Sequence, residues 1–172
     1  YQEVNPDIVT IGKSIGNGHP LSAVITTKKL ANQFNNGMEY FNSFGGNPVS
    51  SAIGQTVLKI IKDEKLQKNA LSVGSYLKKE LLNLKNTFEI IGDIRGEGLF
   101  LGIEIIAEIN AIKPNPKAAK QIVNEMKELG VLLSTDGPDN NVIKIKPPII
   151  FNKNDADFLL NKLDKTISSV LK

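Results

Sequence analysis

The sequence predicts an α/β fold in two parts, a first part built on a β-sheet followed by a small α+β unit. Two short β-branched runs flank a glycine-rich loop near the start, which is typical of a sheet domain. After residue 62, amphipathic helices alternate with pairs of short strands, which is typical of a separate α+β unit. The charged segment Lys62–Lys65 lies between the two patterns. We therefore expect two domains, residues 1–62 and residues 63–172.

The first predicted strand spans Asp7–Gly12 and contains the apolar run Ile8–Ile11. A second strand is expected at Leu21–Thr27, and a short helix follows from Lys28. A strand as apolar as the first requires neighbours on both sides and cover on both faces. The residues around it offer one evident sheet partner. We therefore expect a buried strand whose sheet continues in a segment that precedes this sequence.

Two long helices are expected next. Pro48 suits the first turn of a helix, and Asn47 is a plausible N-cap. Apolar residues recur at helical spacing from Val49 to Ile61. A second helix is predicted over Gln67–Leu84, where an apolar stripe repeats with the same period.

The remaining chain carries paired strand signals and two more helices. In chain order we expect strands at 88–95 and 99–106, a loop around 114–116, a helix at 118–129, strands at 131–134 and 142–146, and a final helix. The Gly96-Glu97-Gly98 segment signals a hairpin between the first two strands. Gly130 is the expected helix stop. The final helix is expected to be capped by Asn154 or Asp155.

The composition excludes several classes of protein and site. It has 41% apolar and 23% charged residues, which is typical of a globular chain. The chain has no cysteine and a single histidine, His19, so we expect neither a disulfide nor a metal site. No stretch approaches the roughly 18 apolar residues of a membrane helix. The net charge is +3, but Arg95 is the only arginine and the lysines are scattered, so neither nucleic acid nor membrane is an expected partner.

Two loops carry groups that could do chemistry. Lys13 stands at the end of the first predicted strand, before a glycine-rich loop. A lysine amine can form a Schiff base with an aldehyde. Ser43 precedes Gly45-Gly46 and a predicted helix, and a hydroxyl with backbone N–H groups at a helix N-terminus can bind phosphate. Aldehyde and phosphate together describe pyridoxal 5′-phosphate (PLP). The alternatives are a solvated loop lysine and a plain turn.

Four segments strongly resemble, in their order along the chain, the hallmarks of class III, fold-type I PLP-dependent aminotransferases. They are Pro6–Thr27 (PDIVTIGKSIGNGHPLSAVITT), Met38–Gly54 (MEYFNSFGGNPVSSAIG), Ile94–Ile105 (IRGEGLFLGIEI) and Asn141–Pro148 (NVIKIKPP). Within the family, the GNGHP, MEYFNSFGGNPVS and KIKPP motifs are most similar to the phospho-lyase subgroup, often named alanine–glyoxylate aminotransferase 2-like. The resemblance implies the C-terminal part of a longer enzyme, with residues 1–62 from the large PLP-binding domain and 63–172 forming the small domain.

The resemblance assigns roles to individual residues. It implies that Lys13 is the Schiff-base lysine and that Ser43 binds the cofactor phosphate of the neighbouring subunit. Such sharing implies a homodimer or a dimer of dimers. The family's aspartate that pairs with the pyridinium nitrogen belongs to a motif upstream of the lysine, and Asp7 does not match it. We therefore expect this chain to be inactive by itself.

Lys144 carries the clue to the reaction. Many relatives place an arginine at this position to bind the α-carboxylate of the substrate with a two-pronged hydrogen bond. A lysine is a poorer carboxylate ligand, and ethanolamine phosphate has no carboxylate. Lys144 is thus a substrate-binding candidate that favours a phospho-lyase. Arg95 is expected to be structural, paired with Glu104 or Asp93.

The expected function is a PLP-dependent phospho-lyase that uses Lys13 to release phosphate and ammonia from ethanolamine phosphate or 5-phosphohydroxylysine. Its partner is then a small-molecule amine. The alternatives are a transaminase of the alanine–glyoxylate type and, in another class, a non-catalytic α/β interaction domain. The resemblance implies a mitochondrial protein, with the cytoplasm as the alternative.

Overall fold

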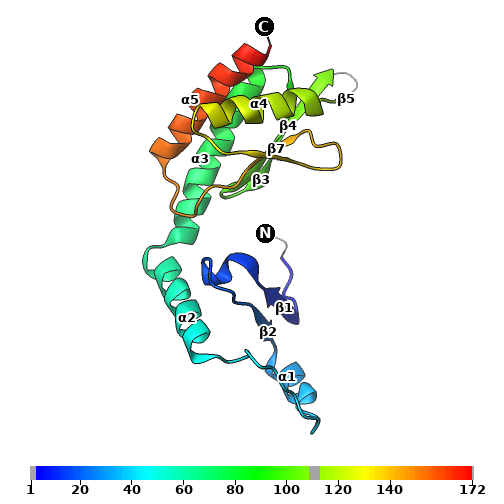
Figure 1. Cartoon of the computed structure of the whole chain (residues 1–172), viewed down its shortest axis with the longest axis vertical. Coiled ribbons are helices and arrows are strands. Elements are labelled where there is room, and N and C mark those ends of the chain that lie inside the picture. The colour runs from blue at the N-terminus through cyan, green and yellow to red at the C-terminus, as the bar shows by residue number, and fades with distance from the viewer. Residues whose placement is uncertain (1–2, 109–112, 172) are drawn as a thin grey trace. The chain divides into compact units, whose positions relative to one another are not determined.

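The computed structural model describes residues 3–108 and 113–171. The chain divides into two compact units, Tyr1–Glu64 and Lys65–Lys172. Among the described residues, no helix is both long and apolar enough to cross a membrane. Figure 1 shows the helices and strands of both units.

The first unit is built on a two-stranded antiparallel sheet. Strand β1 (Ile8–Ile11) pairs with β2 (Ala23–Thr26). The connection between them contains the 3-10 turn η1 (Lys13–Gly16). Helix α1 (Lys28–Phe34) follows β2, and α2 (Pro48–Asp63) ends the unit.

Strand β1 forms where it was expected, and the expected burial is not reached within the described residues, which offer the one sheet partner that the sequence indicated. Ile8 is 57% exposed, and Ile25 on the neighbouring strand is 55% exposed. The reason is that β1 has β2 as its one partner within the described residues. β-Branched residues favour an extended backbone whether or not another layer covers them.

The start of α2 is confirmed. The side chain of Asn47 accepts a hydrogen bond from the Ser50 N–H, and Pro48 occupies the first turn. Thr27 caps α1 in the same way through the Leu30 N–H. These caps satisfy N–H groups that a helix leaves unpaired at its N-terminus.

The second unit packs helices on an antiparallel sheet with the strand order β3-β4-β7-β6, and β5 pairs with β4 (Figure 1). In chain order its elements are α3 (Leu66–Thr87), β3 (Ile91–Glu97), β4 (Phe100–Glu108), β5 (Lys113–Pro114), α4 (Pro116–Glu128), β6 (Ser134–Asp136), β7 (Val142–Ile145) and α5 (Lys153–Val170). The expected hairpin is confirmed, because two residues, Gly98 and Leu99, join β3 to β4. Gly130 follows α4 with φ +83°, as a helix stop does.

Two strands of this unit start later than the sequence predicted. The expected first strand began at Phe88, but the Phe88 N–H closes α3 by bonding to Leu84, so β3 starts three residues later. The strand expected at 131–134 forms at β6, because the Val131 N–H bonds to Met126 at the end of α4.

The loop expected around 114–116 is also replaced by regular structure. Pro114 lies in β5 and Pro116 opens α4, with Asn115 as its N-cap. Proline is well suited to both places, because it lacks an N–H that a strand edge or a first helical turn would leave unpaired.

The N-cap of α5 is Asn152, where Asn154 or Asp155 was expected. Its side chain accepts hydrogen bonds from both of their N–H groups, while the Asp155 carboxylate accepts one from the Asn152 N–H. This reciprocal pair is a capping box. Asp155 therefore takes part in the cap as the third residue of α5, not as the N-cap.

The core lies between the sheet and its three helices. Alternate residues of β4 and β7 are buried, and they meet an apolar stripe from each helix. The most deeply buried side chains are Leu77, Leu81, Leu101, Ile103, Ile105, Ile122, Met126, Ile143, Ile145, Leu163 and Ile167. On α5, Phe158 lies outside this stripe and is half exposed.

Replacement of Ile122 by alanine tests this core. Ile122 is fully buried, so the change is expected to lower the free energy of unfolding by about 2–5 kcal/mol. Leu71→Ala is the matched control, because Leu71 is 52% exposed on α3 and its loss is expected to cost about 0.5 kcal/mol or less. Urea unfolding followed by circular dichroism measures both. Equal losses would contradict the placement of the core.

Candidate functional site

Lys13 follows β1 after one residue, Gly12, and is the first residue of η1. Its φ is +54°, in the left-handed region that non-glycine residues adopt uncommonly. The side chain is exposed and makes no hydrogen bond or ion pair with another described residue. Hydrogen bonds from Ile15 N–H to Gly12 and from Asn17 N–H to Ser14 hold the surrounding turn. The turn therefore presents an amine that is free to react, on a backbone of defined shape.

Ser43 lies in a tight turn just before α2. Asn42 shapes this turn, because its side-chain oxygen accepts from the N–H groups of Phe44 (3.2 Å) and Gly45 (3.0 Å). The Asn47 N–H then bonds to the Phe44 carbonyl at 3.2 Å. Ser43 is exposed, and its hydroxyl has no hydrogen-bond partner among the residues that the structure describes.

Hydrogen-bond donors remain available at this end of α2. The backbone N–H groups of Gly46 and Val49 make no hydrogen bond within the described residues, and both are exposed. With the Ser43 hydroxyl they form a set of donors at a helix N-terminus, where the helix dipole also favours an anion. This donor set suits a phosphate group.

The first unit thus offers two of the groups that PLP requires, a free amine for its aldehyde and N–H and hydroxyl donors for its phosphate. Lys13 and Ser43 both lie on turns that adjoin α2 or β1, and both are exposed. The residues present therefore fit the cofactor. Lys144 belongs to the second unit.

Lys144 lies on β7 and forms an ion pair with Asp136 on the neighbouring strand β6. The Lys144 Nζ to Asp136 Oδ2 distance is 2.7 Å, and the lysine side chain is 33% exposed. The hydrogen bond from Lys144, with one from the Gly137 N–H, holds the pKa of Asp136 below its ordinary value. The ammonium of Lys144 is therefore already neutralised by a carboxylate of the same chain.

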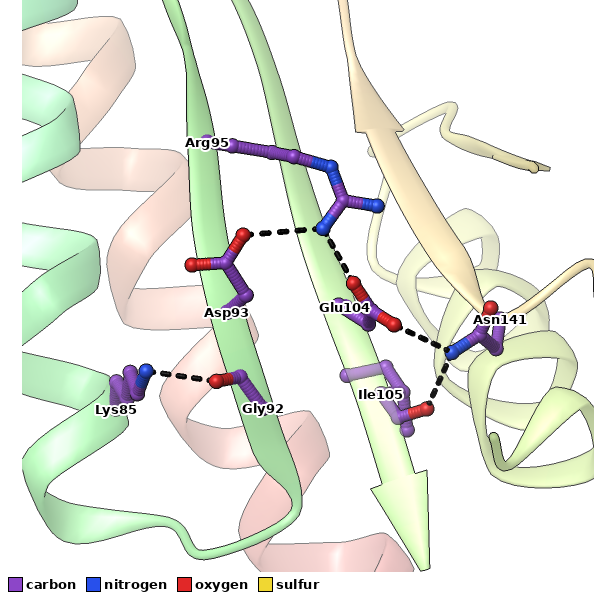
Figure 2. Close-up of polar contacts among 7 residues, drawn as sticks. All are labelled: Lys85, Gly92, Asp93, Arg95, Glu104, Ile105 and Asn141. Carbon is purple, nitrogen blue, oxygen red and sulfur yellow. Dashed lines mark hydrogen bonds and ion pairs between the residues drawn. The ribbon is translucent and has the colours of Figure 1, made fainter. Parts of the chain in front are cut away.

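Arg95 pairs with both carboxylates that were expected as its partners (Figure 2). Its guanidinium lies 3.1 Å from Asp93 Oδ2 and also binds Glu104, whose other oxygen accepts from Asn141. Buried Asn141 donates in turn to the Ile105 carbonyl at 3.0 Å. The hydrogen bonds to Glu104 and Asp93 raise the pKa of Arg95. This network joins β3, β4 and the start of β7, which is a structural role.

One polar contact beside Lys13 was missed in the sequence. The His19 Nε2 atom lies 2.8 Å from the Ser50 hydroxyl, and both side chains are partly buried. The two residues are 31 positions apart, and neither has a local pattern that signals the pairing. The GNGHP and NPVS motifs contain them, but the motifs alone do not show that they meet.

Comparison with known proteins places these features in one family. The sequence profile described as "Aminotransferase class-III" matches residues 1–167. An alanine–glyoxylate aminotransferase 2-like protein of Drosophila melanogaster is 49% identical over 99% of this chain and 35% of its own length. A mitochondrial alanine–glyoxylate aminotransferase 2 homolog of Arabidopsis thaliana is also 49% identical, over 97% of the chain and 35% of its own. For an ethanolamine-phosphate phospho-lyase homolog of Caenorhabditis elegans, the identity is 43%, over 95% of the chain and 35% of its own.

Solved structures agree with these relatives. An Arthrobacter phospholyase in complex with phosphoethanolamine matches with a TM-score of 0.93 and 42% identity, over 97% of this chain and 40% of its own. A PLP-bound amine transaminase from a Pseudomonas species matches with a TM-score of 0.84 and 26% identity, over 95% and 38%. The fold is therefore that of the fold-type I transaminases, as expected. The chain spans about a third of the length of the curated relatives it matches.

Proposed function

The chain belongs to the class-III aminotransferase family, and from this premise we propose that it is the lysine-bearing part of a PLP-dependent phospho-lyase. Its substrate is a phosphorylated primary amine, either ethanolamine phosphate or 5-phosphohydroxylysine. The observation that carries this proposal is the Lys144–Asp136 ion pair. It stands where the resemblance places a carboxylate-binding arginine, and a lysine that already pairs with Asp136 is a poorer ligand for an α-carboxylate.

Pyridoxal phosphate is the cofactor of this family. When bound, it supplies an aldehyde that links covalently to amines and a ring that accepts the electrons released at the neighbouring carbon. We assign to the Lys13 amine the role of bonding to this aldehyde. The Ser43 hydroxyl and the free N–H groups of Gly46 and Val49 are assigned to a cofactor phosphate, that of the neighbouring subunit.

Lys13 has a second role once a substrate amine has taken its place. Its freed Nζ removes a proton from the substrate carbon that bears the nitrogen. Where the adjacent carbon carries a phosphate, that phosphate leaves, and water then releases an aldehyde and ammonia. Return of that proton by Lys13 to a different carbon would instead lead to transfer of the amino group. The same lysine therefore serves both reactions, and the substrate pocket selects between them.

A transaminase of the alanine–glyoxylate type is the second candidate. It is favoured by the names of the Drosophila and Arabidopsis relatives. The name of the Arabidopsis relative also supports a mitochondrial location, which we propose for this protein. The alternative of a non-catalytic interaction domain has no comparable support. It does not account for Lys13, which stands in the family's glycine-rich motif and has no partner among the described residues.

We also propose that the working protein is longer than this chain and is a homodimer with shared cofactor sites. An aromatic cluster supports the dimer: Tyr40, Phe41 and Phe44 lie on the surface around Ser43, with Phe41 79% and Phe44 85% exposed. Exposed aromatic side chains are enriched at protein interfaces. The exposed strands β1 and β2 support the proposal that the protein is longer, because a sheet of two strands is only marginally stable by itself.

The substrate assay tests the reaction. The complete protein is incubated with ethanolamine phosphate, with 5-phosphohydroxylysine, and with alanine plus glyoxylate, and free phosphate and glycine are measured. Phosphate release from one phosphorylated amine is the expected result. Glycine formation without phosphate release would favour the transaminase instead.

Replacement of Lys144 by arginine is expected to raise transfer from alanine about tenfold, because a charge-assisted two-pronged bond forms in the transition state. Lys146→Arg is the matched control, since Lys146 is an exposed lysine two residues away. The rate of glyoxylate amination measures both variants. If Lys144→Arg and Lys146→Arg have the same rate as the wild type, Lys144 does not face the substrate.

A further inference from the structure

His19 and Ser50 connect the turn that carries Lys13 to the first turn of α2. The His19 Nε2 to Ser50 Oγ distance is 2.8 Å. The backbone N–H of His19 bonds to the Gly16 carbonyl at 3.1 Å, so the backbone that carries the imidazole is held at the end of η1. Both side chains are partly shielded from solvent, which strengthens a hydrogen bond relative to water.

The packing around this hydrogen bond is close. Among the described residues of the first unit, Gly16 and Gly54 are the buried ones, and Leu21 lies against both. A Cβ atom at Gly54 would approach Leu21 Cδ2 to 2.6 Å, and one at Gly16 would approach Leu21 Cβ to 3.1 Å. The loop after Lys13 therefore rests on α2 through an apolar contact, and the His19–Ser50 bond is its polar anchor.

Ser50 also belongs to the cap of α2. Its N–H donates to Asn47 Oδ1 at 3.0 Å, and the Asn47 N–H bonds to Phe44 in the turn that holds Ser43. A continuous chain of hydrogen bonds therefore runs from the Lys13 turn, through His19, Ser50 and Asn47, to the Ser43 turn. No other polar side-chain contact in the described residues joins these two turns.

We propose that His19 is a positioning residue, which fixes the Lys13 turn on the first turn of α2 through Ser50. The inference rests on the proposed role of Lys13 and goes beyond it, because His19 acts through Ser50 and needs no contact with substrate or cofactor. Loss of the bond frees the turn, so the Lys13 amine holds the cofactor in a less defined orientation and releases it faster.

The test compares His19→Ala, Ser50→Ala and the double variant in the complete protein loaded with PLP. The rate of cofactor release during dialysis and the visible circular dichroism of the bound cofactor are measured. Each single variant is expected to release cofactor about three- to tenfold faster, which corresponds to one hydrogen bond. Because both changes break the same bond, the double variant is expected to match the single ones. The visible circular dichroism is expected to weaken in all three.

Two further variants separate positioning from general loss of structure. His19→Gln keeps a side-chain group able to bond Ser50 and is expected to recover most of the wild-type release rate. Ser51→Ala is the matched control, because Ser51 is an exposed neighbour on α2 whose side chain has no hydrogen bond among the described residues. It is expected to behave as the wild type.

The inference is overturned if His19→Ala and Ser50→Ala leave release and circular dichroism unchanged, or if their effects multiply in the double variant. Faster release with unchanged circular dichroism would also overturn it, since that is the result of destabilisation alone. A wild-type protein that binds no PLP would instead contradict the proposed function, and the role of His19 with it.

Discussion

Replacement of Lys13 by alanine is expected to abolish activity and the visible absorbance of bound PLP together. The side chain lacks any partner among the described residues, so its removal breaks no contact of the fold. In the proposed mechanism it removes both the amine that holds the cofactor and the group that takes the substrate proton. Proton transfer by a positioned group alone contributes about 10²–10⁴-fold to a rate, so a loss of about 10³-fold or more is expected.

Lys29→Ala is the control for this change. Lys29 is exposed on α1 in the same unit, and its replacement is expected to leave both absorbance and activity as in the wild type. Absorption spectra and turnover of the complete, PLP-loaded variants measure the difference. Retention of the visible band by Lys13→Ala would show that another lysine holds the cofactor.

Replacement of Phe44 by aspartate is expected to break the proposed dimer. Phe44 is 85% exposed, and it follows Ser43 directly. A charge in the centre of an aromatic interface must be desolvated without a partner, and changes at such central residues cost about 30-fold or more in affinity. Activity is expected to fall with the dimer, because the proposed contact of Ser43 with the neighbouring cofactor phosphate is then lost.

Sedimentation velocity of the complete protein measures the effect over a range of concentrations. Leu171→Asp is the control, because Leu171 is half exposed at the end of α5, in the second unit. This variant is expected to sediment as the wild type. A Phe44→Asp variant that remains dimeric at low concentration would place the interface elsewhere.

Helix starts and turns in this chain were predictable because they depend on residues that are neighbours in the sequence. Asn47 before Pro48 marks the start of α2, and the glycines around Glu97 mark the β3–β4 hairpin, since each requires only the backbone preferences of neighbouring residues. The exposure of β1 is not a local property of this kind, and follows from its single sheet partner among the described residues. It depends on which other strands and layers are present, and β-branched residues do not encode their own cover.

The candidate site likewise contains residues that motifs suggest and contacts that depend on how distant segments pack. Lys13 and Ser43 were proposed from their motifs, because each stands at a fixed offset from glycines. The Lys144–Asp136 pair was missed because it depends on the strand register, in which Ser134 lies opposite Lys144 and Asp136 opposite Val142. Asp136 was expected in a turn, but it is the last residue of β6, where its carboxylate can reach the Lys144 ammonium on the neighbouring strand. The His19–Ser50 bond likewise depends on how a loop packs on a helix 31 residues away.

The central claim is that Lys13 binds the aldehyde of PLP, and chemical trapping tests it most directly. The complete protein is loaded with PLP and treated with borohydride, which reduces the lysine–cofactor bond to a stable link, and the peptides are mapped by mass spectrometry. We predict one modified peptide, with the phosphopyridoxyl group on Lys13. A label on a different lysine, or no label on a protein that retains its fold, would contradict the account.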